Sequence, residues 1–414
     1  METRPTAAIL TIGDELLKGR ALNTNAQFLG RELTRLGFKV RAQKSCPDET
    51  GPIIASLREA LAEAPVVVLT GGLGPTPDDV TREAVAEHYG VSLEFSQDQY
   101  RHIVRYYKGR KKNVPAIVRK EALFPSNAVP LVNRHGIALG FSIEDGKHLV
   151  AVLPGVPREQ EKMFAELVTP LLKKKFPGLK AKYSLVVKTA GISEPDVMSK
   201  LGSSFFSDPF DFGIYPYAGE VSFFNQAETP AVITRLRRHI EKRLKEHVYA
   251  YEDLSLAEVV GRLLLKKRAT LAAAESCTGG ALSAVLTSVP GSSRYFKGGV
   301  VAYANEIKEK QLGVPAAVLN SKGAVSPETA RAMARGVREK CRAVYGVGIT
   351  GIAGPDGGTK TKPVGTVCIA LAGPRQTRVW KFVFSGDRQA IQTKSTVKAL
   401  ELLWRELRGP RGLR

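Results

Sequence analysis

Two long stretches of the chain alternate short apolar segments with amphipathic helical patterns, and this alternation constrains the fold more than any other feature. In the first stretch, strands are predicted at residues 8–12, 38–42, 66–69 and 148–153, and helices at 25–36, 53–63 and 80–88. The continuous apolar run at 66–69 is typical of a strand that is buried on both faces. We therefore expect a parallel α/β sheet that is covered by helices on both sides.

The alternation is interrupted in the middle of the chain and then resumes. A lysine-rich segment at 173–178 ends the first pattern, and short predicted strands then surround a basic helix at 231–247. Further helices are expected at 256–267 and 281–286, with strands at 270–274, 300–304, 344–349, 366–372 and 378–384. We expect two α/β/α sandwich modules joined by a small α+β connector, with domains at 1–168, 169–252 and 253–414.

Composition excludes several classes of protein. The chain has 414 residues and 43% hydrophobic residues, and no apolar run approaches the ~18–20 residues of a membrane span. Its first residues lack the pattern of a signal peptide. The four cysteines show no CxxC spacing, which speaks against a zinc site. These observations predict a cytoplasmic protein with no membrane association.

The formal net charge of +21 permits partners that are nucleic acids, anionic lipids or small acidic substrates. The basic residues are dispersed, with clusters at 101–112, 173–182, 235–245 and 405–414. None of these clusters has the aromatic-interleaved pattern of a nucleic-acid-binding module. We therefore expect a generally basic surface and not a dedicated nucleic-acid platform, and the small-molecule nucleotide substrates that we also expect are what the resemblance stated below implies.

Two polar motifs follow predicted strands in the N-terminal stretch, where open α/β sheets bind ligands. One covers residues 11–25 and the other covers 70–79. The candidate residues for a nucleotide or its phosphates are Asn23, Asn25, Gly71, Gly72, Gly74 and Thr76. The candidate ligands of a divalent cation are Asp14, Glu15, Asp78 and Asp79. The alternative for the two later aspartates is a purely structural role at the positive end of the next helix.

A segment with more chemical content joins the predicted strand 270–274 to the helix 281–286. Ser276 can be an ordinary helix cap or a nucleophile, and Thr278 could provide the cap equally well. Gly279 and Gly280 would expose backbone N–H groups that stabilise an oxyanion. No histidine follows residue 247, so a base from this module has to be another residue type. Lys308 can serve if burial lowers its pKa, although most lysines are exposed.

A second group of residues in this region has the chemistry to hold a substrate. Thr350, Gly351 and Gly354 lie in a glycine-rich segment whose backbone N–H groups could bind a phosphate, or which could simply form a tight turn. Arg388 could contact the same phosphate with two parallel hydrogen bonds. Asn305 could cap a helix or, with the substrate that the resemblance below implies, orient its carboxamide.

The C-terminal motifs resemble those of the CinA C-terminal module, the nicotinamide mononucleotide amidase family. The matching motifs are Glu-Ser-x-Thr-Gly-Gly, Pro-Gly-Ser-Ser, Tyr-x-Asn-x-x-Lys and Gly-Ile-Thr-Gly-Ile-Ala-Gly-Pro, and the likeness covers about residues 255–408. It implies hydrolysis of nicotinamide mononucleotide to nicotinate mononucleotide and ammonia without a metal. The implied catalytic residues are Ser276, Ser293, Tyr303 and Lys308. The favoured assignment is Ser276 as nucleophile or oxyanion donor, Lys308 as base and Tyr303 as proton relay, with Ser293 as the competing nucleophile.

The N-terminal motifs are similar to the molybdopterin-binding fold, and more closely to the N-terminal part of CinA. This resemblance implies a phosphoanhydride activity on ADP-ribose that depends on a divalent metal. It also implies a homo-oligomer, which we expect to be a homodimer. The segment Gly136-Ile-Ala-Leu-Gly140 lacks the threonine and the proline of the family's Gly-Thr-Ala-Pro-Gly. This departure speaks against full activity of the N-terminal module. The alternative function is that of a nucleic-acid-binding accessory protein in competence or the response to DNA damage.

Overall fold

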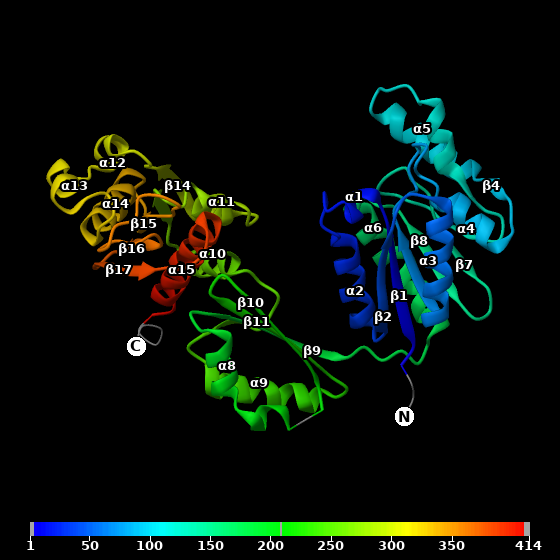
Figure 1. Cartoon of the computed structure of the whole chain (residues 1–414), viewed down its shortest axis with the longest axis horizontal. Coiled ribbons are helices and arrows are strands. Elements are labelled where there is room, and N and C mark those ends of the chain that lie inside the picture. Colours follow the sequence, from blue (N-terminus) through cyan, green and yellow to red (C-terminus); the bar gives the residue numbers. More distant parts are fainter. Residues whose placement is uncertain (1–3, 208, 410–414) are drawn as a thin grey trace. The chain divides into compact units, whose positions relative to one another are not determined.

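The computed structural model describes residues 4–207 and 209–409, so the end of the basic cluster at 405–414 lies outside the described residues. The chain divides into two compact units, residues 1–182 and 183–414. In the described part of the chain, no helix combines the length and the hydropathy that a membrane span requires. Figure 1 labels the helices and strands of both units.

The first unit is built on a six-stranded sheet of order β2-β1-β3-β8-β7-β6. Its strands are β1 (Thr6–Ile12), β2 (Lys39–Cys46), β3 (Val66–Thr70), β6 (Val129–Leu131), β7 (Gly140–Glu144) and β8 (Leu149–Leu153). The first four strands in this order are parallel, whereas β7 pairs antiparallel with both β8 and β6. The wholly parallel sheet predicted from the alternation was therefore wrong at this edge, because β6, β7 and β8 follow one another without an intervening helix.

Helices cover both faces of this sheet. They are α2 (Thr24–Leu36), α3 (Thr50–Glu63), α4 (Thr81–Tyr89), α6 (Pro157–Met163) and α7 (Thr169–Lys175), with η2 (Phe164–Val168) between the last two. The short helix α1 (Asp14–Leu17) follows β1 and buries no side chain. Alternate residues of β1 enter opposite cores, since Leu10 packs with α3 and α4 while Ile9 packs with α2 and α7. This period of two produces the expected α/β/α sandwich. A smaller substructure adds β4 (Leu93–Phe95), α5 (Gln97–Gly109), η1 (Ala116–Ala122) and β5 (Leu123–Pro125).

The second unit begins with the connector, a four-stranded antiparallel sheet of order β10-β11-β9-β12. Its elements are β9 (Tyr183–Ala190), α8 (Glu194–Leu201), η3 (Ser203–Phe206), β10 (Asp211–Tyr217), β11 (Glu220–Ala227), α9 (Pro230–Leu244) and β12 (Val248–Ala250). The side chains of β11 alternate strictly between buried and half-buried. One face of the sheet therefore forms a core with α8 and α9.

The remainder of the second unit is a module with a five-stranded sheet of order β14-β13-β15-β16-β17. Its strands are β13 (Leu271–Glu275), β14 (Phe296–Val301), β15 (Tyr345–Gly351), β16 (Thr366–Ala372) and β17 (Thr377–Val383). β14, β13 and β15 are parallel, and β16 pairs antiparallel with both β15 and β17, so this sheet is also mixed. The strand expected at 300–304 ends earlier, which leaves Tyr303 in the loop after it.

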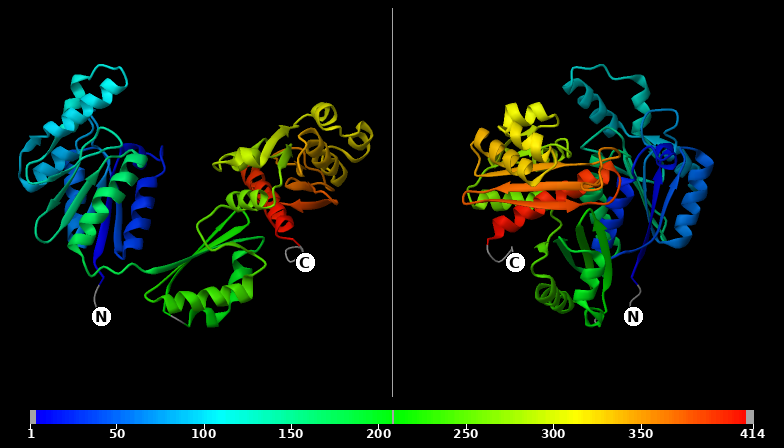
Figure 2. Two further views of the ribbon diagram at one scale, coloured as in Figure 1. Left: turned by 180° about the vertical axis from the view of Figure 1, so that it is seen from behind. Right: turned by 60° about the vertical axis from the view of Figure 1, so that its left-hand side comes forward.

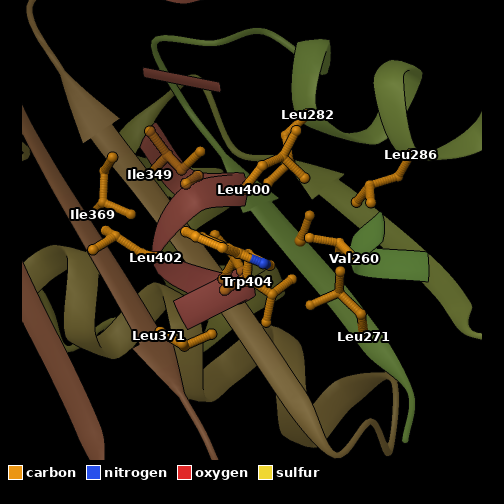
Figure 3. Packing of buried hydrophobic residues seen from close by; sticks show 14 of the residues in the cluster. Val260, Leu271, Leu282, Leu286, Ile349, Ile369, Leu371, Leu400, Leu402 and Trp404 are labelled. Atoms are coloured by element: carbon orange, nitrogen blue, oxygen red, sulfur yellow. The ribbon is translucent and has the colours of Figure 1, made fainter. Parts of the chain in front are cut away.

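This sheet is also sandwiched between helices (Figure 2). The helices are α10 (Leu256–Lys266), α11 (Ala281–Thr287), α12 (Asn305–Leu312), α13 (Ala316–Lys322), α14 (Pro327–Lys340) and α15 (Arg388–Arg408), and η4 (Ser292–Arg294) is a short 3-10 turn. One face packs with α10, α11 and α15 around the buried Trp404, as Figure 3 shows. The other face packs mainly with α14 over small residues of the strands.

Glycines in β15 allow α14 to lie directly on the sheet. A Cβ atom at Gly348 would be 2.5 Å from the carbonyl oxygen of Ala330 and 2.7 Å from the backbone nitrogen of Ala334, both in α14. A side chain at this position would push the helix away from the strand that ends in Thr350. The close approach therefore fixes the position of the sheet edge described below.

We expect Gly348→Val to lower the free energy of unfolding by about 1–3 kcal/mol, the usual cost of overpacking a tight core. Chemical denaturation of the full chain measures this change. Gly51→Ala is the matched control, because nothing lies within 4 Å of a Cβ atom at Gly51. An unchanged stability of Gly348→Val would show that α14 is not held against β15 as the structure indicates.

Candidate functional site

One pocket in the C-terminal module collects many of the residues that the sequence singled out. It has a volume of about 200 Å³ and lies where β13 and β15 end, beside the first turn of α15. The predicted residues that line it are Ser276, Tyr303, Lys308, Thr350, Gly351 and Arg388. Cys277, Ala324, Val325 and Ala353 complete the lining.

The buried carboxylate of Glu275 determines the path of the loop that carries Ser276. This side chain is fully buried at the end of β13. It accepts hydrogen bonds from the backbone N–H groups of Gly280, Leu282 and Ser283 and from the Ser283 hydroxyl, at 2.7–3.1 Å. The carboxylate thus binds the first N–H groups of α11, which otherwise have no partner within the helix. The sequence analysis assigned no role to Glu275.

Ser276 is not the cap of α11, so the cap interpretation of this residue was wrong. The helix starts at Ala281, with Gly280 in the capping position at a φ of 101°. Thr278 does not cap the helix either, and its buried hydroxyl has no partner in the described structure. The backbone of Ser276 is anchored because its N–H donates to the carbonyl of Ile349 at 2.9 Å. Its side chain is therefore held at the pocket by the two adjacent strands.

Lys308 is almost completely buried, with 1% of its surface exposed, although it lies on the short helix α12. Its amine donates to the backbone carbonyl of Tyr303 at 2.9 Å, and no acidic side chain pairs with it in the described part of the chain. Desolvation by burial lowers the pKa of Lys308 from its ordinary value of 10.5. The amine is therefore closer to neutrality than a surface lysine, which is the state that can accept a proton.

Arg388 connects the two sides of the pocket entrance. Its guanidinium group donates to the carbonyl of Gly354 at 2.7 Å and to the Tyr303 hydroxyl at 2.8 Å. Asp387 caps α15 by accepting from the N–H of Ala390, which fixes the turn that presents the arginine. A guanidinium has five N–H donors, so these contacts leave donors for an anionic ligand.

The other candidates of this module are dispersed around the pocket. Thr350 is buried and donates to the carbonyl of Ala324 at 2.7 Å. Ser293 is exposed in η4, and Asn305 is exposed as the first residue of α12, whose cap is Ala304. Neither Ser293 nor Asn305, nor Thr278, Gly279, Gly280 or Gly354, lines the pocket.

Cys277 lines the pocket but lacks the properties of a nucleophile. Burial raises the pKa of its thiol to about 12, so the thiolate is scarce at neutral pH. Its carbonyl accepts from the Gln392 amide at 2.8 Å, a contact with α15 that the sequence analysis missed. The loop 323–326, which supplies Ala324 and Val325, was also missed. Ser326 before Pro327 is a helix-start signal that could have placed it.

The N-terminal unit contains a second pocket, of about 190 Å³, at the ends of β1 and β3. Of the predicted residues, Glu15, Asn23 and Asn25 line it, together with Thr11 and Thr70. The Asn25 amide donates to the Thr70 hydroxyl at 3.2 Å and to the carbonyl of Gly155 at 2.7 Å. Its buried Oδ1 atom has no partner in the described structure, so it could accept from a ligand.

The glycine-rich loop lies outside the lining of this second pocket. Gly71 has a φ of 112°, and a Cβ atom there would be 2.1 Å from the carbonyl oxygen of Ile12. Gly72 and Gly74 are similarly packed, against Thr81 and the Asp79 carboxylate. Asp79 accepts hydrogen bonds from the N–H groups of Gly74 and Thr76 and thereby holds its own loop.

Several acidic side chains of this unit lie near one another, but in the described structure they do not form a complete set of metal ligands. Asp14 pairs with Lys18, and Asp48 accepts from the N–H of Asp14 at 2.8 Å. Burial raises the pKa of Asp48, and the charges of Glu15, Asp14 and Asp78 add to this effect. Among residues 4–207 and 209–409, no three His, Cys, Asp or Glu side chains form a group that could hold a metal ion. Asp48 belongs to this cluster and was missed from the sequence.

Comparison with known proteins covers both units. Residues 253–407 match the CinA C-terminal domain, and residues 8–174 match the probable molybdopterin binding domain. A putative competence-damage inducible protein of Moorella thermoacetica is 40% identical over 97% of this chain and 98% of its own length. Its counterpart in Clostridium acetobutylicum is 39% identical over 96% and 98%. A CinA structure from Thermoplasma acidophilum, described as of unknown function, is 34% identical and covers 41% of this chain and 98% of its own, with a TM-score of 0.38.

We expect Glu275→Gln to lower the free energy of unfolding by about 1–3 kcal/mol, because the amide nitrogen would face N–H donors and leave them unsatisfied. Denaturation of the full chain measures this change. The exposed Glu309 offers a control of the same chemistry, and Glu309→Gln should leave stability unchanged. Equal stabilities of the two variants would show that the Glu275 carboxylate does not hold the loop.

Proposed function

Because this chain belongs to the CinA family, we propose that its C-terminal pocket hydrolyses the carboxamide of nicotinamide mononucleotide to give nicotinate mononucleotide and ammonia. The observation that carries this proposal is the buried Lys308 amine, which lines the same pocket as Ser276 and has no acidic partner in the described structure. Burying a charged amine without a counter-ion costs free energy. A buried lysine in a pocket is therefore a candidate for a functional residue. Such an activity would serve pyridine nucleotide recycling in the cytoplasm.

The proposed reaction uses Ser276 and Lys308 in two steps. The Ser276 hydroxyl attacks the carboxamide carbon while the Lys308 amine takes its proton. The carbon–nitrogen bond then breaks, and this proton leaves with ammonia. Water attacks the resulting ester with Lys308 again as base, which releases the carboxylate and restores the hydroxyl. The lowered pKa of Lys308 supports its role as base.

Backbone groups near Ser276 support stabilisation of the oxyanion. In the described part of the chain, the N–H group of Thr278 donates to no carbonyl or carboxylate oxygen. It is therefore available for a negatively charged oxygen. Ser276 could alternatively donate its hydroxyl to that oxyanion, with Ser293 as the nucleophile, although the exposed position of Ser293 favours Ser276.

Arg388 and Tyr303 are assigned to the substrate's phosphate and to proton transfer. The arginine has donors left after its bonds to Gly354 and Tyr303, so it can bind a phosphate at the pocket entrance. The Tyr303 hydroxyl accepts from Arg388 while its backbone carbonyl accepts from Lys308. The hydroxyl of Tyr303 therefore lies at the anion-binding group, whereas the Lys308 amine contacts only its backbone carbonyl, so a relay by this hydroxyl stays a prediction.

The second pocket supports a second proposal, the hydrolysis of ADP-ribose in the N-terminal module with a divalent cation. Hard cations are often bound by one or two carboxylates together with substrate phosphates. Glu15 lines the pocket, and the clustered charges of Asp14, Asp48 and Asp78 would be relieved by a cation. These carboxylates would supply only part of the ligands of a cation, the substrate's phosphates would supply the rest, and the cation would neutralise charge there. The homodimer expected from the family stays a prediction, which the mass in solution would test.

We expect Lys308→Met to lower kcat for ammonia release from nicotinamide mononucleotide by about 100-fold to 10,000-fold, the usual contribution of a general base. Stability should stay equal or rise, because methionine fills the site without a buried amine. Lys310→Met is the control, since Lys310 is 71% exposed on the same helix.

Ser276→Ala should lose as much activity as Lys308→Met, and Ser293→Ala should lose little.

The pH profile supplies a readout that a structural role would not change. Activity needs the neutral amine, so kcat/KM should rise with pH through the lowered pKa of Lys308 and level off below pH 10.5. Stability should also rise with pH between the lowered pKa and 10.5, because the unfolded state binds more protons in that window. A fully active Lys308→Met, or an unchanged acid limb in that variant, would contradict the assignment.

For the N-terminal module, we expect AMP formation from ADP-ribose to require added divalent cation. Asp78→Asn should weaken the response to the cation, because it removes one of the clustered charges around Asp48. Asp98→Asn, at an exposed aspartate on α5, is the control. Cation-independent AMP formation, or an unaltered cation response in Asp78→Asn, would count against the proposal, and ammonia release in the same variant would verify that the amidase pocket is intact.

A further inference from the structure

The segment from Gln97 to Ala122 concentrates positive charge on a single projection of the N-terminal unit. It contains eight lysines and arginines and two acidic residues, which gives it a net charge of +6 out of +21 for the whole chain. Figure 1 shows α5 at the end of this unit, where it extends beyond the sheet. The sequence analysis predicted no helix here, so it treated the basic residues of 101–112 as dispersed charge.

The helix places three of these cations in one line. Arg101, Arg105 and Lys108 are spaced by four and three residues, and all three are exposed. They therefore share one helix face over a length of about 10 Å. Arg110, Lys111 and Lys112 are also exposed and extend the charge past the end of the helix. We call Arg101, Arg105 and Lys108 the basic stripe.

The basic stripe is largely without neutralising partners. Arg101 pairs with Asp98, while the described structure gives no acidic partner to Arg105 or Lys108. Like charges at these spacings repel one another and destabilise a helix. On α9, by contrast, Arg237 pairs with Glu241. The arrangement on α5 therefore lowers the stability of the free protein, and an external anion would remove this cost.

The opposite face of α5 fixes the stripe to the module. Ile103 is fully buried and packs in a small core with Val118 and Ala122. The His102 Nε2 atom donates to the carbonyl of Gly136 at 2.9 Å. At the end of the helix, the Arg110 guanidinium stacks over the Tyr106 ring at 3.5 Å from its centre. The helix that carries the three cations is therefore anchored to the module through its buried face.

The shape of the basic stripe indicates which class of anionic partner it can bind. The stripe is a line on a convex helix and lines none of the pockets described above, so it does not enclose a small phosphate compound. Ile103, Tyr100 and Tyr107 of α5 pack inward and no apolar residue of this helix is fully exposed in the described structure, whereas a helix that inserts into a membrane interface exposes an apolar face beside its cations. A nucleic-acid duplex carries one charge per about 1.7 Å, so 10 Å of its length presents about six phosphates.

We propose that the basic stripe on α5 binds the phosphate backbone of a nucleic-acid duplex without sequence preference. This binding would be independent of both proposed hydrolytic activities. The net charge alone led us to expect that nucleic acid is not a partner. The alignment of Arg101, Arg105 and Lys108 on one face of α5 changes that expectation. Each cation that contacts a phosphate should release condensed counterions and add about one unit to the dependence of affinity on salt.

The test measures binding of the full chain to a fluorescently labelled random-sequence DNA duplex between about 50 and 200 mM salt. The triple substitution Arg101→Gln, Arg105→Gln and Lys108→Gln should weaken binding at least about tenfold at low salt and reduce the salt slope by about 3. The matched control is Arg238→Gln, Lys242→Gln and Lys245→Gln, which removes the same charge from exposed positions on and just after α9. This control should bind as the native protein does.

Circular dichroism and ammonia release from nicotinamide mononucleotide verify that both variants are folded. Equal losses in the two triple variants would overturn the proposal, because binding would then follow net charge alone. An absence of DNA binding by the native chain near physiological salt would also overturn it. Co-sedimentation with phosphatidylserine vesicles, without DNA binding, would assign the stripe to lipid instead and would equally refute it.

Discussion

The C-terminal pocket depends on the buried carboxylate of Glu275. This group lies at the end of the central strand β13, where the chain leaves the sheet, and it binds the first N–H groups of α11 through its two oxygens. Five residues between strand and helix are thereby held in a short loop whose geometry needs positive φ angles at Gly279 and Gly280. Ser276 reaches the pocket because this loop is fixed at both ends. A charged acceptor makes hydrogen bonds about twice as strong as a neutral one, which suits a loop that has to stay in place.

The pKa of Lys308 in the pocket is determined by burial and by the absence of an acidic partner in the described structure. The sheet edge, the loop 323–326 and α12 together exclude water from the Lys308 amine, and the described structure provides only a backbone carbonyl as its partner. Burial without a counter-ion moves the pKa downward, whereas an adjacent carboxylate would have moved it upward. The Glu275 carboxylate is committed to the helix N-terminus and so does not neutralise the amine. The same fold therefore satisfies the buried carboxylate with hydrogen bonds and lowers the pKa of the buried amine.

Local patterns predicted most elements but not the order of the sheets. The strand expected at 366–372 coincides with β16, and the helix expected at 256–267 ends one residue later than α10. The antiparallel edges were missed because alternation does not record which strands pair. Lys308 could be chosen as a candidate base from the lack of histidines, but its burial comes from tertiary packing of a polar helix. Glu275 and Asp48 were missed because a lone acidic residue in a sequence does not reveal its hydrogen bonds.

The long helix α15 links the pocket to the connector within the second unit. Its first turn carries Arg388, whose guanidinium closes one side of the pocket. Near its other end, the Trp404 ring packs edge-on against Tyr249 with ring centres 6.2 Å apart, and Arg408 donates to the carbonyl of Val248. The β10–β11 turn also meets α15, since Tyr217 and Ala218 line a hollow with Gln389 and Thr393. One continuous helix makes all of these contacts, so α15 joins the packing of the connector to the turn that presents Arg388 at the pocket.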